Sequence, residues 1–154
     1  METKAIYKPE ENKLVVTGTL TNFRYSTSKY KSDEHYQISV KTSDLTPELI
    51  ADIKERYFSD TKDKYLPSFV KDVEKNGCDE PIFINLQSKY EVGTFIEGEG
   101  NKRYSYDDVI ELGEGLAPLH SEVKLSMRLK DGAVYPLAIM ITTLKKQDAS
   151  DYFD

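Results

Sequence analysis

Basic and aromatic residues are neighbours at several places in this 154-residue sequence. Four of these places are Arg24-Tyr25, Lys29-Tyr30-Lys31, Lys89-Tyr90 and Lys102-Arg103-Tyr104. Cations contact phosphates while aromatic rings stack on unpaired bases. The combination therefore predicts a surface that binds single-stranded nucleic acid without sequence specificity, with the four tyrosines Tyr25, Tyr30, Tyr90 and Tyr104 as stacking rings. Further phosphate contacts are expected from Lys41, Lys124, Arg128 and Lys130.

Each ring also has a structural interpretation, because tyrosine is favoured in strands and packs in the cores of small β-domains. A position at a strand end or in a loop favours exposure to solvent, and this applies to Tyr25, Tyr30 and Tyr104. Tyr36, Tyr57 and Phe69 are assigned to the core.

Residues for covalent or metal chemistry are few. His35 and His120 have no nearby Cys, His or HxxE-type partner, and Cys78 is the single cysteine. A structural zinc site needs about four such ligands, and the sequence has neither a GxxxxGKS/T nor a GxGxxG phosphate-binding pattern. Among 27 acidic residues a chance pair of carboxylates is expected, so a metal-dependent hydrolase with Asp/Glu ligands is the weaker alternative. We expect a protein that is not an enzyme and uses no cofactor or metal.

Charge is distributed unevenly along the chain. The net charge is −6, yet residues 12–41 and 122–146 each sum to +3, while residues 42–121 sum to −8. If the two basic segments share one sheet, they form one basic face on an acidic protein. A scattered arrangement would favour an acidic protein-binding module, for example a DNA mimic that acts on a basic partner such as a nuclease.

Alternation of apolar and polar residues predicts a mainly β chain. Strands are expected at residues 14–25, 36–41, 82–86, 92–96, 123–129 and 133–144. Helices are expected after Thr46-Pro47, at residues 67–75 and, for a single turn, after Ser105. Gly18 predicts a bulge or bend in the first strand, and Asp131-Gly132 predicts a tight turn between the last two. The last strand is apolar on both faces, so we expect it to be covered on both sides.

Residues 147–154 are expected to form an acidic, disordered C-terminal tail after a single domain at 1–146. Such a tail has two interpretations. It can simply solvate the end of the chain, or aromatic residues among carboxylates can dock in a basic pocket of a partner protein or of the chain's own domain. The residues concerned are Asp148, Asp151, Tyr152, Phe153 and Asp154.

No apolar run approaches the roughly 20 residues that span a bilayer, and the first residues lack the regions of a signal peptide. We therefore expect a soluble, intracellular protein with no membrane partner. A barrel with exposed edges can also pair with a second copy, so a homodimer stays open.

Three stretches of the sequence, together with the tail, resemble the single-stranded DNA-binding proteins of bacteriophages, which have an OB-fold. The stretches are VVTGTLTNFRY, HYQISVKTSDLTPELI and SEVKLSMRLKDGAVYPLAIMITTLKK. The resemblance implies a five-stranded Greek-key OB-type barrel with one to three short helices and single-stranded DNA bound across it. It also implies that the tail recruits replication or recombination proteins, in the cytoplasm of an infected bacterial host.

Overall fold

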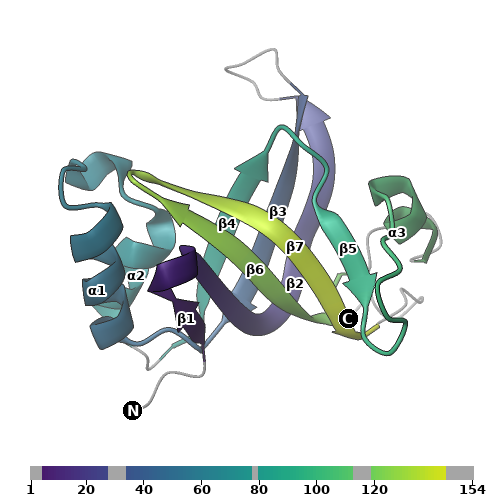
Figure 1. The fold of residues 1–154 in the computed structure, drawn as a ribbon, viewed down its shortest axis with the longest axis horizontal. Helices are drawn as coiled ribbons and strands as arrows, with labels where there is room; N and C mark the ends of the chain where they lie inside the picture. Colours follow the sequence, from purple (N-terminus) through teal and green to yellow (C-terminus); the bar gives the residue numbers. More distant parts are fainter. Residues whose placement is uncertain (1–4, 28–33, 78–79, 113–118, 145–154) are drawn as a thin grey trace, which may run out of the picture.

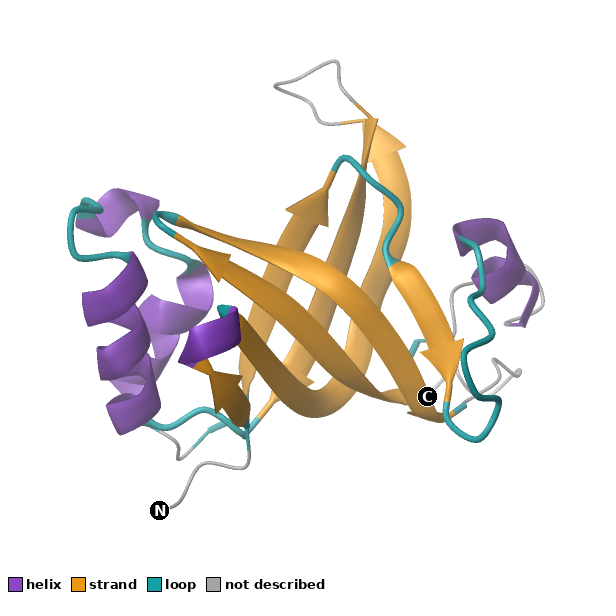
Figure 2. Ribbon diagram, viewed as in Figure 1, coloured by secondary structure: helices purple, strands orange, loops and turns teal. Residues whose placement is uncertain are grey.

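The computed structural model describes residues 5–27, 34–77, 80–112 and 119–144. Within them the chain is mainly β, as predicted, and its strands form one sheet that folds back on itself (Figure 1). Two helices lie together at one end of the sheet, and a third helix lies at the opposite end (Figure 2). None of the described helices is long and apolar enough to cross a membrane.

The sheet has seven strands within the described residues. They are β1 (Ile6–Lys8), β2 (Lys13–Thr27), β3 (Glu34–Thr42), β4 (Ile82–Ser88), β5 (Gly93–Ile96), β6 (Glu122–Lys130) and β7 (Ala133–Thr143). Their order across the sheet is β4-β3-β2-β6-β7-β5, and β1 pairs with β2. The pairs are antiparallel except β5 with β7, which is parallel. All six strands predicted from alternation are present, and the three-residue β1 was not predicted.

The long strand β2 connects the two halves of the sheet. Residues 13–19 of β2 pair with β6, and residues 19–27 pair with β3. Gly18 lies at this crossing, where a Cβ atom would overlap the carbonyl oxygen of Lys41. The bulge predicted at Gly18 occurs slightly later, as a register shift between Leu20 and Asn22. In Figure 1, β6 and β7 form a near half of the sheet, and β3 and β4 form a far half behind it.

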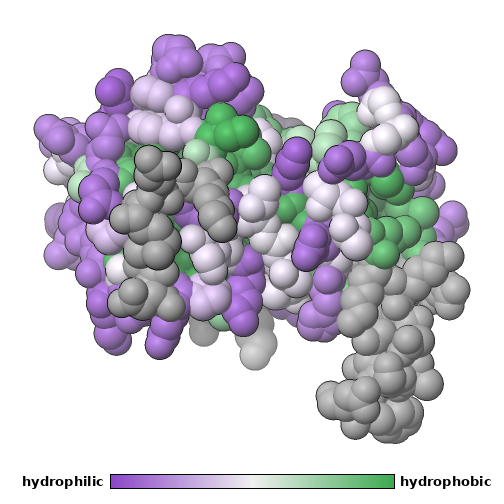
Figure 3. All heavy atoms as spheres, turned by 90° about the horizontal axis from the view of Figure 1, so that it is seen from below, coloured by the Kyte–Doolittle hydropathy of each residue, from purple (hydrophilic) through white to green (hydrophobic). Residues whose placement is uncertain are grey.

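The core lies on the inner side of the folded sheet and contains alternate residues of each strand. Leu20 of β2 pairs with Val40 of β3, and Val16 of β2 pairs with Leu125 of β6; all four are at most 1% exposed. The alternation places polar residues on the outer side. In the view of Figure 3, hydrophobic atoms accordingly reach the surface in separate patches among hydrophilic ones.

Helices α1 (Pro47–Tyr57) and α2 (Ser68–Asn76) follow β3 and cover one end of the sheet (Figure 2). Thr46 caps α1 as predicted, because its hydroxyl oxygen accepts a hydrogen bond from Leu49 N at 3.3 Å. Each helix buries one apolar face, which includes Ile50 and Ile53 in α1 and Phe69 in α2. Tyr57, at the end of α1, is also buried, which confirms its assignment to the core.

Shorter helical segments complete the fold. α3 (Tyr106–Leu112) begins after Ser105, whose hydroxyl oxygen accepts a hydrogen bond from Asp108 N at 3.1 Å. The predicted helical turn after Ser105 is therefore confirmed. Two 3-10 turns, η1 (Pro9–Glu11) and η2 (Asp63–Tyr65), were not predicted.

One side of β7 is exposed, so the expectation that this strand is covered on both sides was wrong. Tyr135 is 46% exposed and Leu137 is 39% exposed. The helices lie at the ends of the sheet instead of across the near half (Figure 2), which leaves the outer side of β7 open.

Candidate functional site

The outer side of the far half presents a continuous polar surface across β2, β3 and β4. Strand register sets its outward residues in three rows, which are Arg24 with Gln37 and Gln87, Asn22 with Ser39 and Asn85, and Thr19 with Lys41 and Phe83. We call this nine-residue surface the polar face. It has a cation in its first and third rows and no acidic side chain in any row. Polar residues occupy these positions because each alternates with an inward apolar residue.

A groove of about 510 Å³ lies elsewhere, between α1 and η2, but its walls include the acidic residues Glu55, Asp63 and Glu74. The polar face has a groove of its own, with a volume of about 330 Å³. Its polar lining consists of Asn22, Gln37, Ser39, Asn85 and Gln87. The groove on the polar face is neutral and rich in amides, unlike the acidic groove between α1 and η2. It therefore better suits a ligand that carries negative charge and also has uncharged polar groups.

Hydrogen bonds fix several side chains of the polar face before any ligand arrives. Arg24 Nε donates to Gln37 Oε1 at 2.8 Å, and Gln37 Nε2 lies 2.8 Å from His35 Nε2. Ser39 Oγ donates to Asn85 Oδ1 at 2.5 Å. Side chains held in this way lose less conformational entropy when they bind a ligand.

Two cations and an exposed aromatic ring are available to a ligand. Arg24 lies at one end of the polar face, and Lys41 lies beside Phe83 at the other end. Lys41 Nζ lies 5.9 Å from the centre of the Phe83 ring, and Phe83 is 45% exposed. Neither Arg24 nor Lys41 forms an ion pair with a described residue. Exposed cations beside an exposed aromatic ring are the combination that binds phosphates and unpaired bases.

An aromatic cluster stands at the end of β2, beside the polar face. The ring of Tyr25 lies 4.7 Å from that of Tyr36, and Tyr106 of α3 contacts both rings and Phe23. Tyr25 is 42% exposed, in agreement with the prediction, while Tyr36 is half-buried instead of belonging fully to the core. Tyr25 alternates with Arg24, so its ring lies on the other side of the strand, at the rim of the sheet.

Lys89 and Tyr90 follow β4 directly. Both are exposed, and Tyr90 is 81% exposed, the largest value among the exposed hydrophobic side chains. A pair of hydrogen bonds between Ser88 Oγ and the backbone of Tyr90, at 2.8 and 3.1 Å, shapes this turn. The predicted exposure of this ring is confirmed, and its place beyond Gln87 puts it near the first row of the polar face.

Tyr104 is buried, at 8% exposure, so its predicted role as a solvent-exposed stacking ring was wrong. Its backbone pairs with Thr94 of β5, and its hydroxyl donates to Glu99 Oε1 at 2.5 Å. Lys102 Nζ lies 4.7 Å from the centre of the Tyr104 ring. The Tyr104 side chain, followed by the charge of Glu99, raises the pKa of Lys102. The sequence around Tyr104 predicted an open loop, because the pairing of Tyr104 with β5 depends on tertiary structure.

Arg103 also serves the packing of this segment. Its guanidinium group lies against Gly93, where an added Cβ atom would be 3.3 Å from Arg103 Cζ, and Nη2 donates to the carbonyl oxygen of Glu91 at 3.4 Å. Lys102, Arg103 and Tyr104 thus belong to the connection between β5 and α3 and not to the polar face.

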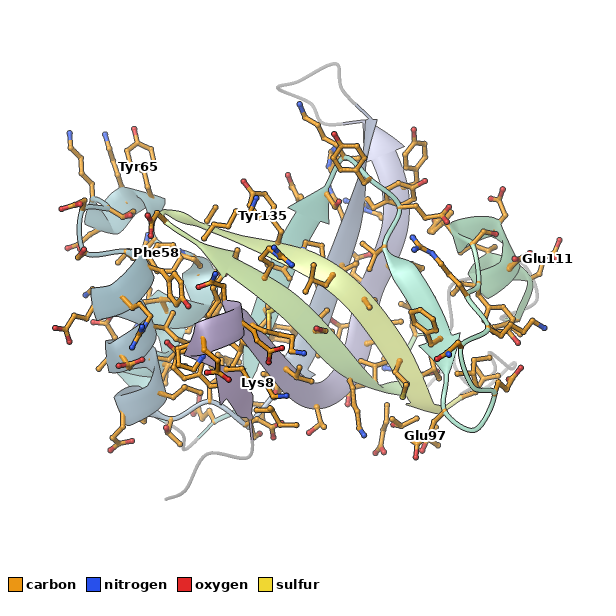
Figure 4. The ribbon with its side chains drawn as sticks, in the orientation of Figure 1. Lys8, Phe58, Tyr65, Glu97, Glu111 and Tyr135 are labelled. Carbon is orange, nitrogen blue, oxygen red and sulfur yellow. The ribbon has the colours of Figure 1, made fainter. Side chains whose placement is uncertain are left out.

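Lys124, Arg128 and Lys130 lie on the near half. Arg128 stands opposite Lys13 of β2, and Lys130 Nζ lies 5.4 Å from the centre of the Tyr135 ring on β7, which Figure 4 labels. The two basic segments do share one sheet, and Lys13 of the first stands opposite Arg128 of the second. Arg24 and Lys41 of the first segment, however, pair with β3 and β4 on the far half, so the cations do not form one face. Glu122, which stands opposite Thr19, further separates the two groups.

Several predicted site residues lie outside the described part of the chain. These are Lys29, Tyr30 and Lys31, and the tail residues Asp148, Asp151, Tyr152, Phe153 and Asp154. Arg24 and Lys41, both predicted to contact phosphates, lie on the polar face in its first and third rows. The remaining polar-face residues were not predicted, because none of them belongs to an adjacent pair of a basic and an aromatic residue. Their signal was weaker, a polar residue at every second position of β3 and β4.

Comparison with known proteins gives no identification. No protein-family model, no curated protein and no solved structure matches this chain. Within the described residues, no group of three or more His, Cys, Asp or Glu side chains is placed to hold a metal ion.

Proposed function

We propose that this chain is a non-enzymatic protein that binds single-stranded DNA on the polar face. The observation that carries the proposal is a grooved surface with two cations, an exposed phenylalanine and no acidic side chain, on a protein of net charge −6. An acidic protein can contact a polyanion through a local surface that carries cations and lacks acidic side chains. Arg24 and Lys41 would contact phosphates, while Phe83 and Tyr90 would stack on bases.

The finer fold is part of the same proposal. Leaving aside β1 and β5, the five remaining strands follow one another across the sheet as the third, second, first, fourth and fifth along the chain, and β4 lies against β7. This order is compatible with an OB-type Greek-key barrel. In OB-folds the second and third strands bear the oligonucleotide, and these would be β3 and β4, which carry most of the polar face.

The roles of the tail and the biological setting rest on the resemblance to bacteriophage single-stranded DNA-binding proteins. Under the proposal, Asp148, Asp151, Tyr152, Phe153 and Asp154 recruit replication or recombination proteins. The protein would act in the cytoplasm of an infected bacterium.

A second function is favoured by a specific observation, the division of cations between two surfaces. The near half carries Arg128 and Lys130 beside the exposed Tyr135 and Leu137, and mixed basic and apolar surfaces also bind proteins. A protein-binding module is therefore the alternative, and a DNA titration separates the two functions.

The proposal is tested by fluorescence anisotropy with a labelled oligo-dT of about 30 nucleotides, longer than the roughly 4–16 nucleotides that one OB-fold covers. The double variant Arg24→Glu/Lys41→Glu is compared with Lys71→Glu/Lys75→Glu, which makes the same charge change on exposed residues of α2. We expect tight binding by the unchanged protein, a loss of at least about tenfold for the first variant and a much smaller loss for the second. Equal losses, or no binding at low salt, would reject DNA binding on the polar face.

A further inference from the structure

The groove of the polar face has an uneven supply of hydrogen-bonding groups. Three of its oxygen acceptors are already in use: Gln37 Oε1 accepts from Arg24, Asn85 Oδ1 accepts from Ser39, and the Ser39 carbonyl oxygen accepts from Thr21 Oγ1 at 3.1 Å. The following inference rests on the proposed function and deepens it, because it concerns which bases this groove takes.

Asn85 is the side chain whose orientation matters most. Its Oδ1 atom is held by the Ser39 hydroxyl at 2.5 Å. The other end of the amide, Nδ2, carries two N–H donors and no acceptor. Asn85 is exposed and lines the groove in the middle row, so these donors are available to a ligand.

Arg24 adds donors at the rim of the groove. Its Nε atom is held by Gln37, which in turn contacts His35. The bond at Nε leaves the terminal Nη groups, which are donors only, since a guanidinium group has no acceptor. Asn22 and Gln87 contribute amides that can offer either a donor or an acceptor. The side chains fixed by hydrogen bonds therefore present donors.

A base that enters a site rich in donors is selected by its own acceptors. Thymine and guanine carry carbonyl oxygens on their edges, which accept from a donor such as Asn85 Nδ2. An asparagine amide reads adenine through N6 and N7 together, and that contact needs the Oδ1 atom that Ser39 already holds. The groove has a volume of about 330 Å³ and opens on the polar face, so a base can approach its lining side chains from solvent. No acidic side chain lines the groove that could accept from an amino group instead.

We propose that this groove binds one nucleobase through a carbonyl oxygen, with Asn85 Nδ2 as the main donor, so that the protein prefers thymine over adenine. The protein then prefers certain bases at this groove, while its phosphate contacts do not depend on the DNA sequence.

The test compares oligo-dT and oligo-dA of about 12 nucleotides, within the range that one OB-fold covers, by anisotropy with the full-length protein. We expect dT to bind about tenfold more tightly than dA, as one well-placed base contact allows. The variant Asn85→Ala should lose most of this preference. Ser39→Ala should lower the preference by raising the affinity for dA, because it frees Asn85 Oδ1 to accept a hydrogen bond. Comparing ratios between variants cancels the different self-stacking of the two oligonucleotides.

Lys41→Ala is the matched control, since a phosphate contact should lower the affinities for dT and dA by the same factor and keep their ratio. If Asn85→Ala also lowers both affinities equally, or if the unchanged protein binds dT and dA equally, base selection by the groove is rejected while DNA binding stands. If the unchanged protein binds neither oligonucleotide, the proposed function fails, and the inference fails with it. Circular dichroism of each variant checks that the fold is retained.

Discussion

Arg24 and Lys41 stand at opposite ends of the polar face, because Arg24 pairs with Gln37 and Lys41 lies four residues further along β3. At about 3.3 Å per residue, the two rows are about 13 Å apart. Two cations at this separation can contact different phosphates of one extended strand. Their contributions to DNA binding should therefore be independent.

Salt dependence measures the number of phosphates contacted. Each contact to a single strand adds about −0.7 to the slope of log affinity against log salt concentration. We expect Arg24→Ala and Lys41→Ala each to reduce the magnitude of the slope by about 0.7, and the double variant by about 1.4. The measurement is anisotropy of labelled oligo-dT between about 50 and 200 mM salt.

Arg128→Ala supplies the comparison on the near half. Arg128 is exposed but lies on β6, opposite Lys13 and away from the three rows of the polar face, so the slope should stay unchanged when it is replaced. A reduction equal to that of Lys41→Ala would mean that DNA also contacts the near half, and the binding surface would have to be redrawn.

Deletion of residues 147–154 tests the proposal that the domain binds DNA and the tail binds partner proteins. The deletion removes three aspartates and no basic residue, so affinity for oligo-dT should stay the same or rise, most clearly at low salt, where charge acts over the longest range. Binding to a replication or recombination partner should be lost. A clear loss of DNA affinity would contradict the role given to the tail.

Gly18 should be essential for the fold, because any Cβ atom there would overlap the Lys41 carbonyl oxygen and approach Val40 Cγ1. We expect Gly18→Ala to lower the free energy of unfolding by about 3 kcal/mol, at the upper end of the cost of overpacking. Urea denaturation measures the change. Thr19→Ala, at the next position, should cost less than about 1 kcal/mol, and an equal loss in both variants would contradict the steric explanation.

Two tyrosine hydroxyls near α1 should contribute differently to stability. Tyr57 Oη donates to Asn12 Oδ1 at 2.9 Å, whereas the buried Tyr7 Oη has no partner with hydrogen-bond geometry among the described residues. Tyr57→Phe should therefore cost about 1 kcal/mol, and Tyr7→Phe should be neutral or stabilising. Equal losses on urea denaturation would mean that Tyr7 has a partner after all.

Tyr7 also makes stability depend on alkaline pH. Burial, and then the neighbouring Asp52 carboxylate, raise the pKa of Tyr7 above its ordinary value of 10.0. The unfolded chain consequently releases this proton first, so the unchanged protein should lose stability as pH rises above about 10. Tyr7→Phe should lose less over the same range.

Local signals in the sequence predicted most of the elements. Thr46 and Pro47 mark the start of α1 because capping depends on adjacent residues, and alternation marks β3 because the inner side of the sheet is apolar. The three rows of the polar face could not be predicted in the same way. They depend on the register of three strands and on the extra residue between Leu20 and Asn22, which no single strand reveals.

The same distinction explains the errors in the candidate site. Tyr104 is next to two cations in sequence, but its partners in space are Thr94 and Glu99, which bury it. Conversely, Asn85 and Ser39 are 46 residues apart in sequence and hydrogen-bonded in the structure. Adjacency along the chain found the right residue types, and only the folded sheet decides which of them meet.

The most direct test of the central claim is a nuclear magnetic resonance titration of the ¹⁵N-labelled protein with oligo-dT of about 12 nucleotides, a length that one OB-fold can cover. We predict that the side-chain amide signals of Asn22, Asn85 and Gln87 shift, together with backbone amides of β3 and β4. Signals of Lys124 to Lys130 on β6 should change little. No shifts, or shifts confined to β6 and β7, would contradict DNA binding on the polar face.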